Sequence, residues 1–470
     1  MSKTVYPYIP NSAAGPKAEM LKVLNIQDEM ELYRDIPAAL RFQGEMDLPK
    51  PLKDEYSIRA HVEKLMGQNA CAKTHSYFIG AGCQHHYTPA VCDEVIGRGE
   101  FLTAYGGIGM ADHGKWQAIW EYQAQMSELL DMDFIGFPQY DGAWSLAHVM
   151  RICARITDRS QVLVPKSMNP MILQICQNYV DGVHKKAVDI IEVEYQRESG
   201  LLDLGDLVSK LGSDTACVIV ENPSFLGSVE SQAEEIGRLA KQAGAEFVVY
   251  ADPLSLGVME APANYGADIT VGDIHNLGLH MGAGGCHGGF IGLKAEEKYL
   301  SNYKDLAISV YPTITGKYGF IWWNFEASSY GIRDEANEFT GTASNLWGIS
   351  AGVYLCMMGP KGMEEIGALN MKRAQYAAKK LAEIEGVSQV FTAPFYNEFA
   401  LNFDRSGKTV AEINAALLTK NIFGGFDLSR QFPELGQSAL YCATETNTKE
   451  DIDRLALVLG QILQQGGMNK

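Results

Sequence analysis

The sequence reads GADITVGDIHNL from residue 266 to residue 277, and a short distance upstream it reads FVVYAD from 247 to 252. Each stretch has an apolar run of strand length; Asp252 closes the first, and His275 and Asn276 follow the second. Similar runs alternate with helical segments between about 133 and 310. This alternation predicts an α/β fold with a mostly parallel sheet, in which ligands bind outside the carboxyl ends of the strands.

The second strand end lacks a residue that this arrangement often carries. Many pyridoxal-phosphate enzymes place an Asp at one strand end, against the pyridine nitrogen, and a Lys at the next, where it holds the cofactor as a Schiff base. Here Asp252 is present, but Asn276 stands at the lysine position, and no lysine occurs between Lys241 and Lys294. The pattern predicts a cofactor scaffold without its nucleophile, and hence a subunit that works with a partner.

The predicted elements divide the chain into an N-terminal arm and cap (1–90), a large domain (91–325) and a smaller α+β domain (326–470). In the large domain we expect strands at 162–165, 189–193, 216–221, 247–251 and 268–271, and helices at 116–130, 169–178, 204–211 and 233–243. In the smaller domain we expect helices at 345–358, 361–384 and 449–464, and strand-like segments at 391–403, 424–427 and 439–445.

The composition excludes several classes of protein. The chain has 470 residues and a formal net charge of −18, which makes binding to nucleic acid or to an anionic membrane unfavourable. No apolar run reaches the roughly 18 residues of a membrane span, and the N-terminus has no run typical of a signal peptide. The nine cysteines are scattered without a Cys-x-x-Cys pair, which indicates reduced thiols. We therefore expect a cytoplasmic protein.

Two turns can be interpreted as binding loops. The stretch YDGAWS at 140–145 opens a helix, where Gly142 and Ala143 would present N–H groups suited to a phosphate. Asp141 in the same turn would repel an anion, and an ordinary helix start is the alternative. Asn222 and Pro223 follow the strand predicted at 216–221. They are interpreted as part of a loop at the ligand-binding edge, with an ordinary strand exit as the alternative.

Glycines and histidines give two further signals. The stretch GAGGCHGG at 282–289 contains five glycines without the Lys-Ser/Thr of a phosphate-binding P-loop, which favours close approach by a ligand or another subunit. His75, His85 and His86 match no zinc-site spacing, so we expect no bound metal.

Taken together, these stretches resemble subunit 1 of decarboxylating glycine dehydrogenase, the P-protein of the glycine cleavage system. The matching motifs occur in order along nearly the whole chain, and ADPLSLG at 251–257 is the most specific of them. The others are YIPN at 8–11, EFLTAY at 100–105, EYQ at 121–123, YDGA at 140–143, NP at 222–223, FLG at 225–227, YGAD at 265–268, VGD at 271–273, NEFA at 397–400 and TE at 444–445.

The resemblance implies a fold-type-I transferase-like fold and a second subunit that carries pyridoxal phosphate on its own lysine. The pair would decarboxylate glycine and pass the aminomethyl group to the lipoyl arm of the H-protein. This chain would bind no cofactor covalently and would supply no catalytic residue.

The resemblance also assigns residues to two places. A degenerate cofactor pocket would contain Asp252, His275, Gly142, Ala143 and Asn222. The edge that completes the partner's site would contain Tyr105, Gly106, Gly107, Gly284, Gly285, Cys286 and His287.

Several segments depart from the family pattern near the expected active edge. A family Pro-Tyr-Gln-Pro-Glu segment becomes GGIGMADH from 106, a Lys-Ala-Thr-Ser-Asn-Ile segment becomes EANEFT at 335–340, Gly-Gly-Pro becomes Gly-Gly-Cys at 284–286, and His-Pro becomes Asn-Pro at 169–170. Three alternatives therefore stay open. They are a paralogous subunit with another amine or acceptor, a regulatory or structural subunit without substrate contact, and a binding protein whose pocket takes a different phosphate ligand.

Overall fold

The computed structural model describes residues 5–42, 44–102, 113–181, 188–333, 338, 340 and 343–464. The chain forms two compact units, one ending at Asn69 and one beginning at Ala70. No helix among the described residues is long and apolar enough to cross a membrane.

The N-terminal unit has helices, but its described residues form no buried core. Its two α-helices, α1 (Ala14–Leu24) and α2 (Glu55–Met66), contain no buried residue. Large apolar side chains along this unit are exposed, among them Tyr8 at 96% and Val23 at 84%. Such residues gain stability only when another surface removes them from water.

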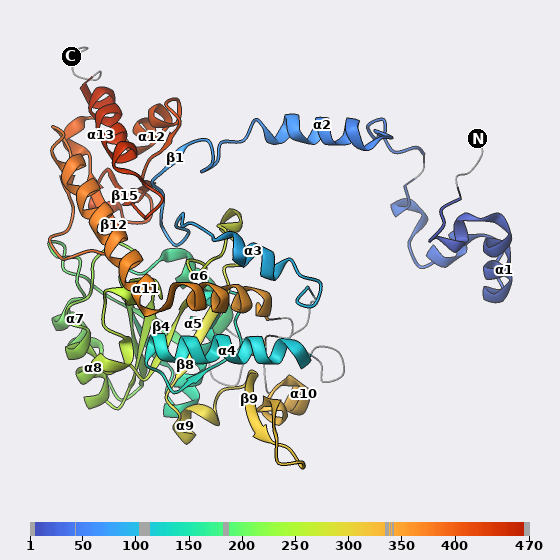
Figure 1. Cartoon of the computed structure of the whole chain (residues 1–470), viewed down its shortest axis with the longest axis horizontal. Coiled ribbons are helices and arrows are strands. Elements are labelled where there is room, and N and C mark those ends of the chain that lie inside the picture. Colours follow the sequence, from blue (N-terminus) through green and yellow to red (C-terminus); the bar gives the residue numbers. More distant parts are fainter. Residues whose placement is uncertain are drawn as a thin grey trace. The chain divides into compact units, whose positions relative to one another are not determined.

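A seven-stranded sheet forms the centre of the second unit (Figure 1), and it confirms the predicted α/β fold. Its inner strands are parallel, and β8 joins them antiparallel. The strand order is β2 (Phe134–Ile135), β8 (Gly289–Leu293), β7 (Ile269–Asp273), β6 (Glu246–Ala251), β5 (Thr215–Asn222), β3 (Gln161–Pro165) and β4 (Asp189–Val193).

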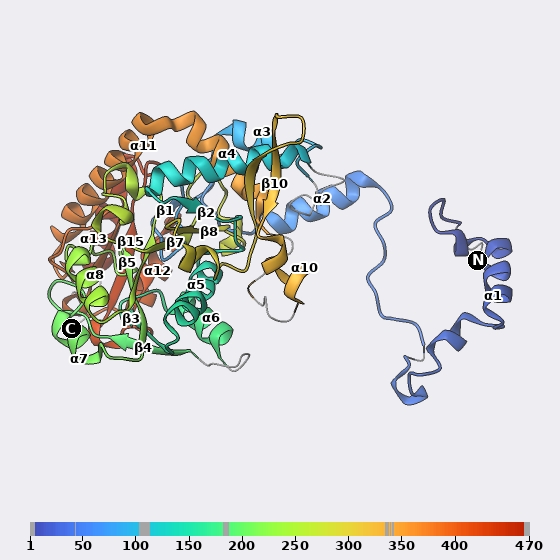
Figure 2. The same cartoon turned by 90° about the horizontal axis from the view of Figure 1, so that it is seen from below.

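Helices cover both faces of this sheet because alternate strand residues point to opposite sides. Phe247 and Val249 pack in the core that includes residues of α4, α8 and α11. Val248 and Tyr250 pack on the other side, in the core with α5 and α6. Figure 2 shows α4 and α11 above β7 and β8, and α5 and α6 below these two strands. The helices are α4 (His113–Leu130), α5 (Gly142–Thr157), α6 (Pro170–Val180), α7 (Leu204–Lys210), α8 (Ala233–Gln242) and α11 (Asn345–Ala382).

The C-terminal part builds a second, four-stranded sheet. Its order is β11 (Ser388–Gln389), β12 (Glu398–Asn402), β15 (Ser438–Cys442) and β14 (Phe426–Asp427), and α12 (Val410–Leu418) and α13 (Lys449–Gln464) contribute to its core. The strand expected at 391–403 is shorter than predicted. Pro394 has no N–H for a ladder, and its carbonyl instead accepts the N–H of Val229 at 2.8 Å.

A short pair of parallel strands brings the segment around residue 80 to the carboxyl edge of the large sheet. Strand β1 (Ser76–Tyr77) pairs with β13 (Ile422–Phe423), outside both larger sheets. The loop that follows β1 therefore runs across the carboxyl edge of the large sheet, where Gly82 and Gln84 reach a pocket.

Two further strands, β9 (Ala307–Pro312) and β10 (Tyr318–Trp323), form an antiparallel hairpin that the sequence pattern did not predict. Within it, the Trp322 ring lies 6.0 Å from the Trp116 ring of α4. The aromatic side chains of β10 therefore pack against helix α4.

Candidate functional site: a carboxylate-lined pocket at the carboxyl edge of the sheet

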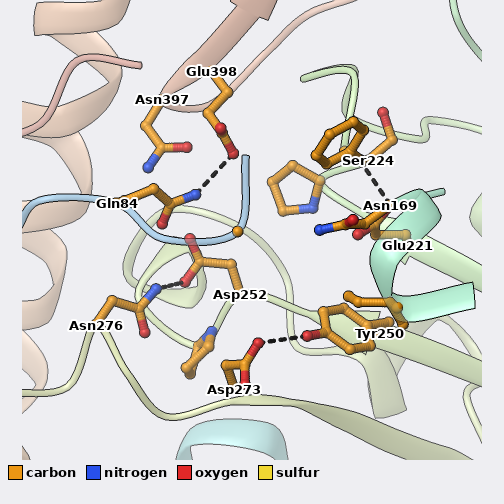
Figure 3. A pocket seen from close by; sticks show the side chains of 15 residues that line it. Gln84, Asn169, Glu221, Ser224, Tyr250, Asp252, Asp273, Asn276, Asn397 and Glu398 are labelled. Atoms are coloured by element: carbon orange, nitrogen blue, oxygen red, sulfur yellow. Dashed lines mark hydrogen bonds between the residues drawn. The ribbon is translucent and has the colours of Figure 1, made fainter. Parts of the chain in front are cut away.

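A pocket with a cavity of about 80 Å³ opens where β5, β6 and β7 end (Figure 3). This is the edge at which the fold class places its ligands. It is lined by Gly82, Gln84, Asn169, Ile172, Glu221, Pro223, Ser224, Phe225, Tyr250, Asp252, Pro253, Asp273, Asn276, Asn397 and Glu398.

Asp252 and Asn276 meet in this pocket, as Figure 3 shows. The Asn276 amide donates a hydrogen bond from Nδ2 to Oδ1 of Asp252. The same oxygen accepts the N–H of Leu254 at 2.8 Å. Oδ2 of Asp252 and Oδ1 of Asn276 are buried and find no hydrogen-bond partner within the described chain. A carboxamide cannot form a Schiff base, so this strand end can bind a ligand but cannot hold pyridoxal phosphate covalently.

The two lysines that flank Asn276 in the sequence lie at the opposite end of the strands. Lys294 Nζ donates to Oδ1 of Asp268 at 2.6 Å, and Lys241 Nζ lies 3.6 Å from the same oxygen. Asp268 precedes β7, and its Oδ2 accepts the N–H of Phe247 near the start of β6. Because the pocket lies where these parallel strands end, neither lysine can replace the missing nucleophile.

The turn considered as a phosphate site already has carboxylate acceptors. The Gly142 N–H donates to Oδ1 of Asp273 at 2.7 Å, and the Trp144 N–H donates to Oδ1 of Asp141 at 2.7 Å. Asp273 also accepts the hydroxyl of Tyr250 at 2.7 Å. These two carboxylates occupy the N–H groups that an anion would need at the start of α5.

Four carboxyl groups give the pocket its electrostatic character. Burial raises the pKa of Glu221 to about 8 and that of Glu398 to about 7. Burial also raises the pKa values of Asp252 and Asp273. No Lys or Arg is found among the described residues that line the pocket. The site is therefore suited to a protonated amine or a neutral hydrogen-bonding ligand, and is unfavourable for a phosphate.

The structure separates some of the predicted pocket residues from the cavity. Ala143 is buried on α5, where its carbonyl oxygen lies 3.6 Å from the Cys176 thiol. Asn222 accepts the N–H of Glu230 at 3.0 Å through Oδ1, and it does not line the cavity. The ring of His275 faces that of His287, with 4.4 Å between the centroids.

The predicted partner edge is described only in part. Tyr105, Gly106 and Gly107 lie outside the described residues, as does most of the departing segment at 335–340. Gly284, Gly285 and Cys286 are exposed at the surface, whereas the neighbouring His287 is buried. The role of this edge stays a prediction.

Several lining residues were not predicted from the sequence. Gln84 Nε2 donates to Oε2 of Glu398 at 2.8 Å, although more than three hundred positions separate them. No local pattern signals that contact. Asp273 had a usable signal, because it lies between the strand predicted at 268–271 and the pair His275 and Asn276.

Comparison with known proteins places the chain in a family. A family model described as "Glycine cleavage system P-protein" matches residues 7–459. The chain belongs to this family. Two P-protein relatives, from Geobacillus kaustophilus and Staphylothermus marinus, are each named a probable glycine dehydrogenase (decarboxylating) subunit 1. The first is 35% identical over 457 residues, covering 97% of this chain and 99% of the relative. The second is 33% identical over 468 residues, covering 98% and 99%.

Solved structures agree with this P-protein assignment. A crystal structure of glycine decarboxylase (P-protein) of the glycine cleavage system, in inhibitor-bound form, has a TM-score of 0.84 and 30% identity. That match covers 98% of this chain and 100% of the other. The sphingosine-1-phosphate lyase of Burkholderia pseudomallei, with a TM-score of 0.65 and 12% identity, shares the fold. The expected fold-type-I architecture is therefore confirmed.

P-proteins depend on pyridoxal phosphate, but the pocket of this chain does not fit that cofactor. The position at which the sequence predicts the lysine carries Asn276, and Asp141 and Asp273 accept N–H groups of the turn that was predicted to hold the phosphate. A Cβ added at Gly142 would overlap the Tyr250 hydroxyl, so the backbone at this turn is closely packed. The cavity of about 80 Å³ is also far below the roughly 300–1,000 Å³ of typical ligand pockets.

Proposed function

We propose that this chain is the subunit without a Schiff-base lysine in a heteromeric enzyme that decarboxylates glycine. A second subunit carries pyridoxal phosphate, and the aminomethyl group passes to the lipoyl arm of the H-protein in the cytoplasm. The name "subunit 1", shared by the relatives over nearly their full length, supports a two-chain enzyme. The alternatives of another substrate or a purely structural subunit have no comparable support.

One observation carries the assignment of the cofactor to the partner. The strand end that should hold the lysine carries Asn276, whose amide is hydrogen-bonded to Asp252. Covalent attachment of the cofactor needs a nucleophilic amine at that point. Lys241 and Lys294 lie at the other end of the strands, which supports an amine supplied by another chain.

The N-terminal unit supports the need for a partner. Its helices bury none of their residues, and the side chains of Leu40 and Tyr56 are exposed at 76% and 83%. Apolar surface of this kind is typical of segments that pack on a second protein. We propose that subunit 2 provides part of the surface that covers them.

The experiment is to co-express this chain with the lysine-bearing subunit of the same genome, add pyridoxal phosphate, reduce with borohydride and map the label. We expect the pyridoxyl group on the partner and none in stoichiometric amount on this chain. The same preparation should exchange labelled CO₂ into glycine in the presence of H-protein, whereas either subunit alone should not. A stoichiometric label on a lysine of this chain would contradict the proposal.

A further inference from the structure

Three side chains from distant segments meet beside the pocket. Cys83 belongs to the loop after β1, His275 to the turn after β7, and His287 to the glycine-rich stretch before β8. One potential ligand atom from each lies within 4.8 Å of the other two. Their chain neighbours Gln84 and Asn276 line the pocket (Figure 3). The fold therefore gathers one thiol and two imidazoles at a point where the sequence has no metal-binding spacing.

Both imidazoles are buried and lack partners on one nitrogen. His275 is 3% exposed and His287 is 8% exposed. The Nε2 atom of each has no hydrogen-bond partner in the described part of the chain. A buried polar atom without a partner is energetically unfavourable, and most such atoms in native proteins are hydrogen-bonded. A cation shared by the two nitrogens would remove that cost.

The chemistry of the cluster selects the kind of ligand. A neutral imidazole and a thiolate are both ligands that coordinate a divalent metal ion. Metal binding by Cys83 would release the proton of its thiol. Asp273 lines the neighbouring pocket and adds an acidic group beside the cluster.

Neighbouring histidines and cysteines are not part of the cluster. His86 Nδ1 is already paired with Glu445 at 2.9 Å, and His85 Nδ1 lies 3.2 Å from the Thr446 hydroxyl. Cys286 is exposed next to His287 in the sequence. The Cys83 thiol lies 3.6 Å from the carbonyl oxygen of Met281, and it satisfies neither Nε2 of His275 nor Nε2 of His287.

We propose that Cys83, His275 and His287 bind one zinc-class divalent ion. Thiolate and imidazole are the ligands that zinc prefers, and three protein ligands leave a fourth position for water or for a molecule in the neighbouring pocket. Zinc–ligand distances of about 2.0–2.3 Å place tetrahedral ligand atoms about 3.5 Å apart, so binding draws the three side chains together. This also pins the loop after β1 to the sheet edge. The proposal does not rest on the function proposed above.

The first test uses cobalt as a spectroscopic substitute for zinc. The full-length chain is treated with a chelator, dialysed and titrated with Co²⁺. We expect one equivalent to bind and to produce a near-ultraviolet thiolate-to-cobalt absorption, which Zn²⁺ then removes by displacement. Binding without the thiolate band, or no stoichiometric binding, would overturn the proposal. This test needs no variant and is therefore independent of any folding defect.

Matched variants assign the ligands. Cys83→Ser should abolish the thiolate band and weaken Zn²⁺ binding by more than about tenfold, and His287→Gln should weaken it similarly. Cys286→Ser and His280→Gln change an exposed cysteine and an exposed histidine nearby, and both should bind Zn²⁺ like the unmodified chain. Zn²⁺ should raise the melting temperature of the unmodified chain and of these controls, but not of the ligand variants. If Cys83→Ser binds as tightly as the unmodified chain, the site is not the one proposed.

Discussion

The two ends of the pocket differ in how their polar groups are satisfied. At the Asp252 end, Asp252 Oδ2 and Asn276 Oδ1 are buried without partners in the described chain. At the α5 end, the N–H groups of Gly142 and Trp144 are each bonded to a carboxylate of the chain itself. The first end is still able to receive a ligand, while the second is closed to anions. The edge of such a sheet can thus keep its fold while internal carboxylates occupy N–H groups that could otherwise bind an anion.

The largest effect is expected from enlarging a glycine at the closed end. A Cβ at Gly289 would overlap the carbonyl oxygen of Asp141, which is backbone and cannot rotate away. Gly289→Val should therefore destabilise the fold by about 3 kcal/mol or more, as overpacking of a rigid site does. Urea unfolding followed by circular dichroism measures this. Wild-type stability in the variant would show that the closed end is loosely packed.

Gly285, in the exposed part of the glycine-rich stretch 282–289, serves as the control position for Gly289. A Cβ there would meet only the Gly282 carbonyl, at 3.9 Å, among the described residues, and the backbone φ of Gly285 is −123°. Gly285→Val should change stability by less than about 0.5 kcal/mol. If this stretch contacts the partner, the variant should bind subunit 2 at least about tenfold more weakly, because a valine would enter a close backbone contact. Size-exclusion with the partner tests this, and undiminished binding would make the stretch an ordinary surface loop.

A smaller effect is expected from removing one buried carboxyl group. Since burial raises the pKa of Glu221 to about 8, the folded state retains a proton that the unfolded chain releases above its ordinary pKa. The contribution to stability is therefore full at low pH and is lost as pH rises toward the folded pKa. Glu221→Gln stays neutral, so its advantage over wild type should grow by about 2 kcal/mol from pH 5 to pH 7.

Urea midpoints at both pH values measure that advantage. Glu234→Gln, at an exposed position, is the control and should show no such trend. An advantage for Glu221→Gln that shrinks as pH rises would mean that the folded state holds the ionised carboxylate, contrary to the effect of burial.

The N-terminal cap of α5, at the end of the pocket that is closed to anions, should contribute less to stability than the changes above. Asp141 accepts the Trp144 N–H at the start of α5, and losing such a cap costs about 1 kcal/mol. Asp141→Ala should lower stability by that amount, whereas Asp141→Asn, which keeps an oxygen acceptor, should lower it less. Equal losses in the two variants would mean that the charge of Asp141, and not its hydrogen bond, matters.

The smallest effect, on cofactor binding, is expected from a substitution at the Asp252 end of the pocket. Asn276→Lys should not form an internal aldimine, because the phosphate turn is still occupied by Asp141 and Asp273. Absorbance titration with pyridoxal phosphate, followed by borohydride reduction and peptide mapping, tests this. Stoichiometric labelling at position 276 would show that the α5 end accepts a phosphate after all, and the contrast between the two ends would fail.

Much of the fold could be predicted because its strands are buried on both faces. The apolar runs at 216–221 and 247–251 are nearly continuous, so they stand out in the sequence, and β5 and β6 occupy them. The edge strand β2 has two residues, and β8 begins in a glycine-rich stretch, so neither shows a period.

The site was predictable only where it follows a strand end. Asp252 and Asn276 close or follow apolar runs, and both line the pocket. Glu398 and Gln84 meet there only through tertiary packing of distant segments, and Cys83 reaches His275 and His287 in the same way. Such contacts leave no local periodicity to detect.

The exposed apolar residues of the N-terminal unit affect how stable the chain is against degradation in the cell. Taken by itself, the unit displays apolar side chains such as Tyr8 and Val23, and its described residues form no buried core. Proteases and chaperones act on such segments, since cleavage requires accessible backbone. The abundance of this chain should therefore follow the supply of whatever covers the unit, and newly made copies in excess should be removed. A folding requirement would in this way regulate subunit stoichiometry without any dedicated control of synthesis.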